Sequence, residues 1–222
     1  MKRVLVVAPH PDDETLGCGG TLLKLKAQGV NVHWLIVTTI EGVPGFSEDQ
    51  TNKRASEIDQ VAAEYAFDGV HKCELPTAQL DTLGKGELVG AVADVITHLK
   101  PDTVLVPYRN DVHSDHAAVF DATVSATKTF RSPFVRSIYA YETLSETDFG
   151  IRPDDPGFRP NLYENIEGYL ERKLDIMALY ESEMDAFPFP RSNECLRALA
   201  TLRGAQANCQ AAEAFMILKE IR

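Results

Sequence analysis

Basic residues are scarce in this sequence relative to acidic ones. The chain has 222 residues, with 22 lysines and arginines against 33 aspartates and glutamates, which gives a formal net charge of -11. Nucleic acids and anionic membrane surfaces attract proteins that carry charge of the opposite sign, so this balance argues against either partner. A chain of this charge can still bind a neutral sugar.

Paired cysteines and long apolar runs are also missing. The cysteines form no C-x-x-C pair, so we expect reduced thiols. They are Cys18, Cys73, Cys195 and Cys209. No apolar run approaches the length of a membrane span. Pro9 and His10 interrupt the run at residues 4–8 before it could form the core of a signal peptide, so we expect a cytoplasmic protein.

Apolar strands and amphipathic helices alternate through the first two thirds of the chain. Residues 4–8 are continuously apolar and β-branched, which is typical of a central strand in a parallel sheet. Further strands are expected at 32–38, 70–75, 103–106 and 136–141, and helices at 17–26, 52–65 and 88–99. The alternation predicts one α/β domain over residues 1–222, with a Rossmann-like, doubly wound, mainly parallel sheet and helices on both faces.

The last third of the sequence is less regular. Residues 144–165 are rich in proline and have no clear period, which indicates a long irregular surface or lid segment. Beyond it we expect two helices, one near 166–177 and one at 193–214. The segment Phe187-Pro188-Phe189-Pro190 lies between them, and we interpret its aromatic residues as packing residues.

Two polar segments follow predicted strands. His10-Pro11-Asp12-Asp13-Glu14 comes after the strand at 4–8, and His113 and His116 come after the strand at 103–106. Ligands of doubly wound sheets bind beyond the carboxyl ends of the strands, so we expect these segments to lie at one site. Imidazoles and carboxylates around an open position suit a divalent metal such as zinc, which lowers the pKa of a bound water.

These segments together resemble the PIG-L/LmbE-type zinc-dependent N-deacetylases. The resemblance is carried by the motifs His10-Pro11-Asp12-Asp13-Glu14, Gly17-Cys18-Gly19-Gly20 and His113-Ser114-Asp115-His116, and it extends to Arg54, Glu57, Arg203-Gly204 and residues 212–215. It implies a hydrolase that removes the acetyl group from an N-acetylglucosamine-like acetamido sugar or sugar conjugate. It also implies one zinc ion per subunit and makes a homo-oligomer plausible.

The resemblance also assigns roles by position. It implies that His10, Asp13 and His116 are the metal ligands and that Asp12 is the general base. Neighbouring side chains diverge in a loop that leaves a strand, so Asp13 can face the metal while Asp12 faces the water.

The remaining assignments concern residues around this centre. The resemblance implies that His113, as an imidazolium held by Asp115, stabilises the oxyanion and then protonates the leaving amine. Asp111 is expected to be a partner outside the ligand set of this centre, and Glu14 is expected to brace the loop by hydrogen bonding. Arg54 is a candidate to bind a sugar hydroxyl or a phosphate, although an exposed ion pair with Glu57 is the more common arrangement.

Several alternatives remain open at this point. Residues 9–13 also have good turn chemistry, and it is the second histidine segment that favours a metal. The same site could hydrolyse a non-sugar amide, or the chain could be a non-catalytic Rossmann-like binding module. His33, His71 and His98 are interpreted as ordinary surface or core residues.

Overall fold

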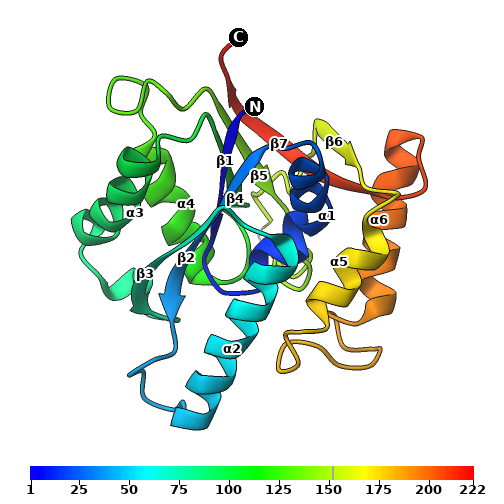
Figure 1. The fold of residues 1–222 in the computed structure, drawn as a ribbon, viewed down its shortest axis with the longest axis horizontal. Coiled ribbons are helices and arrows are strands. Elements are labelled where there is room, and N and C mark those ends of the chain that lie inside the picture. The colour runs from blue at the N-terminus through cyan, green and yellow to red at the C-terminus, as the bar shows by residue number, and fades with distance from the viewer. Residues whose placement is uncertain (152) are drawn as a thin grey trace.

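A seven-stranded mixed sheet forms the centre of the molecule (Figure 1). The structure is a computed structural model that describes residues 1–151 and 153–222. The strand order is β3-β2-β1-β4-β5-β7-β6; β1 to β5 pair in parallel, and β7 is antiparallel to both of its neighbours. The strands are β1 (Arg3–Ala8), β2 (Asn31–Thr39), β3 (Gly69–Pro76), β4 (Thr103–Pro107), β5 (Ser137–Tyr141), β6 (Leu162–Asn165) and β7 (Ala212–Glu220).

Helices cover both faces of this sheet. Helices α3 and α4 lie on one face, and α1, α2, α5 and α6 lie on the other (Figure 1). Their bounds are α1 (Asp13–Ala27), α2 (Glu48–Tyr65), α3 (Lys85–Leu99), α4 (Ser114–Ala126), α5 (Leu170–Met177) and α6 (Asn193–Ala207), and a short 3-10 helix spans Leu80–Thr82. No helix within the described ranges is long and apolar enough to cross a membrane.

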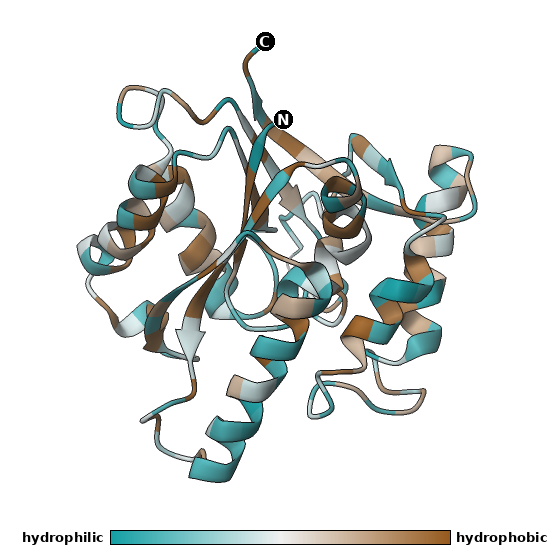
Figure 2. Cartoon of the chain, viewed as in Figure 1, coloured by the Kyte–Doolittle hydropathy of each residue, from teal (hydrophilic) through white to brown (hydrophobic). Residues whose placement is uncertain are grey.

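The central strand β1 explains why its sequence is apolar without interruption. Val4 and Val6 pack into the core under α1 and α2, and Leu5 and Val7 pack into the core under α3 and α4. All four side chains are fully buried, because successive side chains of a strand point to opposite faces. Figure 2 shows hydrophobic strands at the centre and a mostly hydrophilic outer surface on α2. The predicted α/β sheet with helices on both faces is confirmed.

The C-terminal segment corrects one prediction. The helix expected at 193–214 ends at Ala207, where Asn208 takes a left-handed conformation, and Ala212–Glu220 forms strand β7 between β5 and β6. Gly204 permits this turn, because a Cβ there would lie 2.7 Å from the carbonyl oxygen of Cys209. The segment 144–165, expected to be irregular, contains the short strand β6, and its residue 152 lies outside the described residues.

Helix α1 begins at Asp13, earlier than expected, and is kinked at Cys18, where φ is -145°. Beyond the kink, the carboxylate of Glu213 accepts the N–H groups of Gly20 and Thr21 at 2.9 and 2.7 Å and so caps the second half of the helix. Lys173 pairs with the same carboxylate at 2.6 Å. The glycine-rich motif is therefore a kink that a residue from β7 stabilises.

Candidate metal centre and catalytic site

The two polar segments predicted from the sequence meet at the carboxyl edge of the sheet. The first connects β1 to α1, and the second connects β4 to α4. The ring centroids of His10 and His113 lie 4.4 Å apart, and those of His10 and His116 lie 5.6 Å apart. The adjacent strands β1 and β4 thus place histidines that are about a hundred positions apart in the sequence side by side.

Three side chains form a set of donors for one metal ion. His10 Nδ1 lies 3.3 Å from one oxygen of Asp13, and His116 Nε2 lies 3.3 Å from the other. Two atoms bound to a tetrahedral zinc at 2.0–2.2 Å are separated by about 3.4 Å, so the observed spacing fits a shared metal. The side chains of Asp13 and His116 are only 3% and 1% exposed. The residues present therefore fit a zinc ion.

A second group of possible donors consists of His10, His113 and Asp115. The carboxylate of Asp115 already accepts the N–H groups of Ala78 and Leu80 at 2.7 and 3.2 Å. The Nδ1 atom of His113 accepts the N–H of Asp115. Because these lone pairs are engaged, the group with Asp13 and His116 is the better candidate.

Each histidine of the preferred set has a carboxylate behind it. Asp111 lies 2.8 Å from His116 Nδ1 and also accepts the hydroxyl of Thr147 at 2.6 Å. Asp115 lies 3.1 Å from His10 Nε2. Such outer carboxylates fix the tautomer and orientation of histidine ligands. The arrangement leaves His10 Nδ1 and His116 Nε2 directed at Asp13.

The charges in this cluster shift its pKa values strongly. Burial lowers the pKa of His10, but its hydrogen bonds to Asp115 and Asp13 outweigh this and raise the pKa to about 9. The pKa of His116 is raised well above its ordinary value, because the charge of Asp13 and the hydrogen bond to Asp111 outweigh burial. Burial raises the pKa of Asp13, but the two histidines bring it well below its usual value. Asp13 is therefore an anion ready to bind a cation.

The position of His113 corrects the expected pairing with Asp115. The Asp115 side chain contacts His10 and two backbone N–H groups, and only its backbone N–H reaches His113, whose Nδ1 accepts it at 3.1 Å. His113 is thus the N-cap of α4. Burial and the charges of His10 and His116 lower the pKa of His113 to about 4. Both features favour a neutral ring over the imidazolium expected from the sequence.

Asp12 lies beside the candidate metal-ligand set in a strained conformation. Its φ of 144° is in the region that favours glycine, a strain of about 1–3 kcal/mol. Glu14 accepts the N–H of Asp12 at 3.1 Å and the hydroxyls of Thr15 and Tyr180 at 2.6 and 2.9 Å, so it has the bracing contacts expected from the sequence. Burial and the neighbouring Asp13 raise the pKa of Asp12 well above its ordinary value, although Arg191 opposes the shift.

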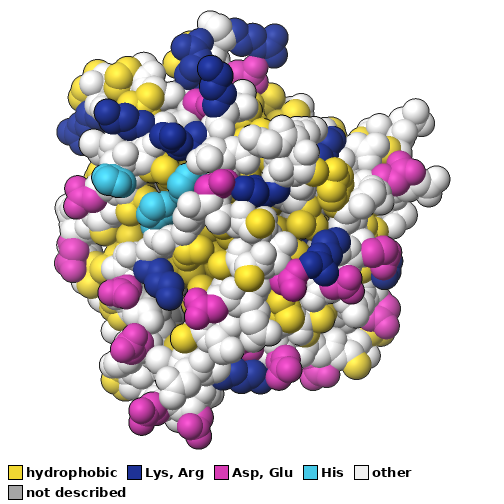
Figure 3. Space-filling model, viewed as in Figure 1, with side chains coloured by type: hydrophobic (Ala, Val, Ile, Leu, Met, Phe, Trp, Pro, Cys, Tyr) yellow, Lys and Arg dark blue, Asp and Glu magenta, His cyan; other side chains and the backbone are white. Residues whose placement is uncertain are grey.

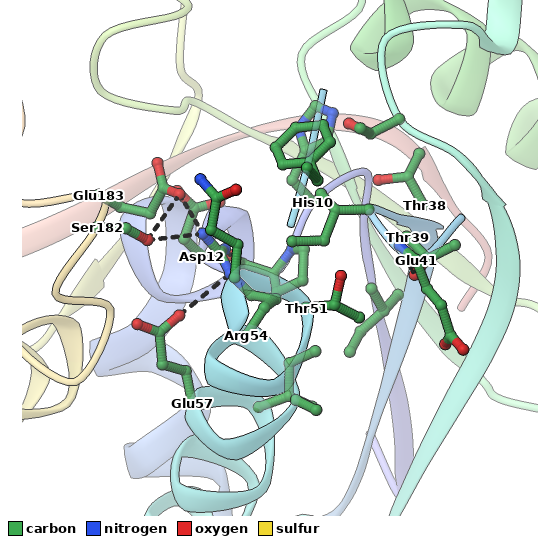
Figure 4. Close-up of a pocket in the computed structure, with 18 of the residues that line it drawn as sticks. His10, Asp12, Thr38, Thr39, Glu41, Thr51, Arg54, Glu57, Ser182 and Glu183 are labelled. Atoms are coloured by element: carbon green, nitrogen blue, oxygen red, sulfur yellow. Dashed lines mark hydrogen bonds and ion pairs between the residues drawn. The ribbon is translucent and has the colours of Figure 1, made fainter. Parts of the chain in front are cut away.

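A cavity of about 390 Å³ opens in front of His10 and Asp12. Its walls come from the carboxyl end of β2, the first turns of α2, part of β3 and the segments around Glu146, Ser182 and Arg191. Figure 4 shows Thr38 and Thr39 on one side of this cavity and Thr51 on another. The wall of this space, which is large enough for a small molecule, thus includes Asp12 and two of the three candidate metal ligands, His10 and Asp13.

A family model described as PIG-L, GlcNAc-PI de-N-acetylase, matches residues 5–127, which is more than half of the chain. The chain belongs to the PIG-L family. The match includes both histidine segments, so the resemblance drawn from the sequence is confirmed.

This PIG-L protein is similar to a deacetylase and to a solved structure over nearly its whole length. The diacetylchitobiose deacetylase of Thermococcus kodakarensis is 26% identical, and the match covers 96% of this chain and 82% of the relative. The conserved protein TT1542 of Thermus thermophilus has a TM-score of 0.80 at 25% identity and covers 100% of this chain and 97% of its own.

A third similar protein shows that this fold is not restricted to deacetylases. The 4-carboxy-2-hydroxymuconate hydratase GalB of Pseudomonas putida KT2440 has a TM-score of 0.78 at 19% identity and covers 100% of this chain and 98% of its own. Because one fold hosts both reactions, the function of a PIG-L chain has to be argued from its site residues.

Arg54, the predicted substrate contact, is engaged by protein groups in this PIG-L chain. It donates to the carbonyl oxygen of Pro11 at 2.8 Å and to Ser182 at 3.0 Å, and it pairs with Glu183 and Glu57 (Figure 4). Arg54 lines the cavity, but its side chain is only 16% exposed. A sugar would have to compete with these partners, so substrate binding by Arg54 stays a prediction.

Arg191 is the site residue that the sequence did not reveal. It follows the Phe187–Pro190 segment and precedes Ser192, the N-cap of α6. Its guanidinium lies on the cavity wall, 3.0 Å from Asp12. The only local signal was an arginine between a proline and a helix cap, and this context is common to many surface arginines.

Proposed function

We propose that this protein is a zinc-dependent N-deacetylase that acts on an N-acetylglucosamine-like sugar or sugar conjugate and releases acetate and a free amine. The observation that carries the proposal is the pair of adjacent carboxylates. Asp13 lies 3.3 Å from both His10 and His116, whereas Asp12, which also lines the cavity, is not part of this donor set. One acid is thereby available to a metal and the other to a water molecule.

Zinc suits the donor set because it binds two imidazole nitrogens and one carboxylate and keeps a position open in catalytic sites. When bound, such a metal polarises an amide carbonyl and lowers the pKa of a water molecule. His10, Asp13 and His116 would hold it. The outer carboxylates Asp115 and Asp111 would keep both imidazoles in the correct orientation.

Asp12 would act as the general base. Its raised pKa makes it a stronger base than an ordinary aspartate, and its place on the cavity wall allows it to take a proton from the attacking water. The protonated carboxyl group can then return this proton to the leaving nitrogen. The cycle restores the ionised aspartate.

His113 would stabilise the oxyanion as a neutral donor. Because Nδ1 accepts a backbone N–H, the ring hydrogen resides on Nε2, and His113 lies on the wall of the same cavity. A preorganised N–H donor of this kind stabilises the negative charge that develops on the carbonyl oxygen. This role replaces the imidazolium expected from the sequence and leaves proton delivery to Asp12.

The substrate class is proposed from the cavity and from the relatives. Thr38, Thr39 and Thr51 line the cavity and make part of its wall polar, which suits a sugar. The diacetylchitobiose deacetylase that matches nearly the whole chain supports an acetamido sugar. The cytoplasmic location and the homo-oligomer expected from the sequence stay predictions.

Elemental analysis of the purified protein, followed by acetate release from N-acetylglucosamine, diacetylchitobiose and a simple alkyl acetamide, tests the proposal. We expect zinc in the protein and acetate from the sugars. In Asp12→Asn the metal content should be unchanged and kcat should fall by about 10²–10⁴-fold. Asp59→Asn, on the exposed side of α2, is the matched control.

Two results would contradict the proposal. Acetate from the alkyl amide but from neither sugar would indicate a non-sugar amidohydrolase. Unchanged turnover in Asp12→Asn would remove Asp12 as the base.

A further inference from the structure

The carboxylate of Asp12 is held on one side only. Its Oδ2 accepts a hydrogen bond from Arg191 Nη1 at 3.0 Å, and within residues 1–151 and 153–222 no hydrogen bond to Oδ1 is found. Asp12 is only 5% exposed at its side chain, so its orientation depends on protein contacts. The strained backbone of Asp12 makes such contacts necessary, because a residue at φ 144° is kept there by its surroundings.

Arg191 brings three separate segments together at this carboxylate. Its Nη1 also donates to Glu183 at 2.6 Å, its Nε donates to Ser145 Oγ at 2.8 Å, and its Nη2 lies 3.6 Å from Glu146. The guanidinium is planar and carries its donors in a fixed fork, so partners on several sides fix its orientation. The position of Oδ2 is therefore set by the loop at 145–146 and the segment at 183.

Arg54 holds the residue that precedes Asp12 in the same network. It donates to the carbonyl oxygen of Pro11 at 2.8 Å and pairs with Glu183, which also pairs with Arg191. A closed ring of contacts results, from Pro11 through Arg54, Glu183 and Arg191 to Asp12. The backbone and the side chain of the loop are thus held through one shared glutamate.

We propose that Arg191 is a positioning residue that holds Oδ2 of Asp12 so that Oδ1 is the atom that takes the proton of the attacking water. The proposal rests on the deacetylase function proposed above. Arg191 itself neither gains nor loses a proton in this role. It acts through Asp12. Without the guanidinium the carboxylate could rotate, and Oδ1 would no longer be held toward the attacking water.

The test is the kinetics of Arg191→Ala and Arg191→Lys. In Arg191→Ala we expect kcat to fall by about 10²-fold with KM changed less than about threefold and with unchanged metal content. Arg191→Lys should recover only part of kcat, because a lysine lacks the forked donors. Millimolar guanidinium should restore part of the activity of Arg191→Ala and none of that of Arg191→Lys.

A double variant separates positioning from a general structural role. If Arg191 acts through Asp12, Arg191→Ala should cause no further loss of kcat in an Asp12→Asn background. An additive loss would overturn the proposal, as would a rise in KM at constant kcat, which would mark a substrate contact. A loss of kcat that follows the melting temperature and resists guanidinium would overturn it too.

The control for these variants is Arg197→Ala. Arg197 lies on α6, the helix that Arg191 precedes, and pairs with Glu171, but both side chains are exposed and neither lines the cavity in the described structure. We expect wild-type kinetics. If the wild type releases no acetate at all, the proposed function fails; if only the Arg191 variants behave as wild type, the positioning role alone fails.

Discussion

Two pairs of histidines in this molecule have similar ring geometry but different surroundings. The ring centroids of His10 and His116 lie 5.6 Å apart with an interplanar angle of 37°, and those of His33 and His71 lie 5.4 Å apart at 31°. The second pair lies where β2 and β3 begin, and Figure 3 shows histidine side chains gathered on that part of the surface. The first pair lies at the carboxyl ends of the strands, where His10 lines the cavity and His116 is buried behind it.

The difference lies in the groups that hydrogen-bond to the rings. His33 Nδ1 and His71 Nε2 contact each other at 3.2 Å, and His33 Nε2 lies 2.8 Å from the amide oxygen of Asn31. These contacts satisfy neutral rings, and burial with neighbouring histidine charge lowers both pKa values. Around His10 and His116 the partners are carboxylates, and the pKa values are raised. Close imidazoles alone therefore do not make a candidate metal site here, whereas imidazoles with carboxylates do.

The largest effect should come from removing a ligand of the first pair. In His116→Ala we expect zinc to be lost and acetate release to fall to background, because the site keeps only two donors. The metal content of dialysed protein measures this directly. His71→Ala is the control and should retain both metal and activity. Zinc retained in His116→Ala would exclude this residue as a ligand.

A smaller effect is expected from the carboxylate behind the same ligand. Asp111→Asn keeps the shape of the side chain but weakens its hold on His116, and it should reduce metal affinity by about 10–100-fold. Competition with a chelator of known affinity provides the measurement. Asp121→Asn, an exposed change on α4, should leave the affinity unchanged. Equal affinities in all three proteins would show that the outer carboxylate is unimportant.

A carboxylate can be introduced beside the second pair, His33 and His71. Asn31→Asp places a carboxylate at the atom that now contacts His33, and it should raise the pKa of His33 relative to the wild type. Titration of the His33 ring signals by NMR would measure the change. Asn52→Asp, on the exposed part of α2, adds the same charge away from the pair. If His33 titrates identically in both variants, the contrast between the pairs has another cause.

The smallest effect concerns the pH dependence of stability. The pKa of His71 is lower in the folded state than its ordinary value of about 6.5, so below that pH the unfolded chain binds more protons and stability falls. When the pH is lowered from about 7.5 to about 5.5, the melting temperature of His71→Gln should fall less than that of the wild type. Activity at the higher pH should be unchanged. A larger loss in the variant would reverse the sign of this argument.

The sequence predicted those features that depend on local patterns. The continuous apolar run of β1 revealed a central strand, and the histidine and aspartate motifs after β1 and β4 identified segments that the structure brings together. Both predictions use residues that are neighbours in the chain or at the ends of adjacent parallel strands. Topological rules are sufficient for such cases.

Other features depend on contacts between distant segments and could not be predicted locally. Residues 212–214 have an apolar pattern that also fits the end of a helix, and only the pairing of β7 with β5 and β6 makes them a strand. Asp115 lies two positions from His113 in the sequence, yet its side chain bonds to His10, because the start of α4 turns it toward β1. Arg191 reaches Asp12 across 179 positions.

The residues that secure the loop after β1 come from the last quarter of the chain. Tyr180 bonds to Glu14, Arg191 to Asp12, Lys173 to the carbonyl of Leu16 and Glu213 to the helix beyond the kink. Synthesis on the ribosome proceeds from the N-terminus, so the loop after β1 is made well before the residues that hydrogen-bond to it. The histidine and aspartate motifs are therefore made early, but Asp12 gains its hydrogen bond to Arg191 only after the segment that precedes α6 has been made.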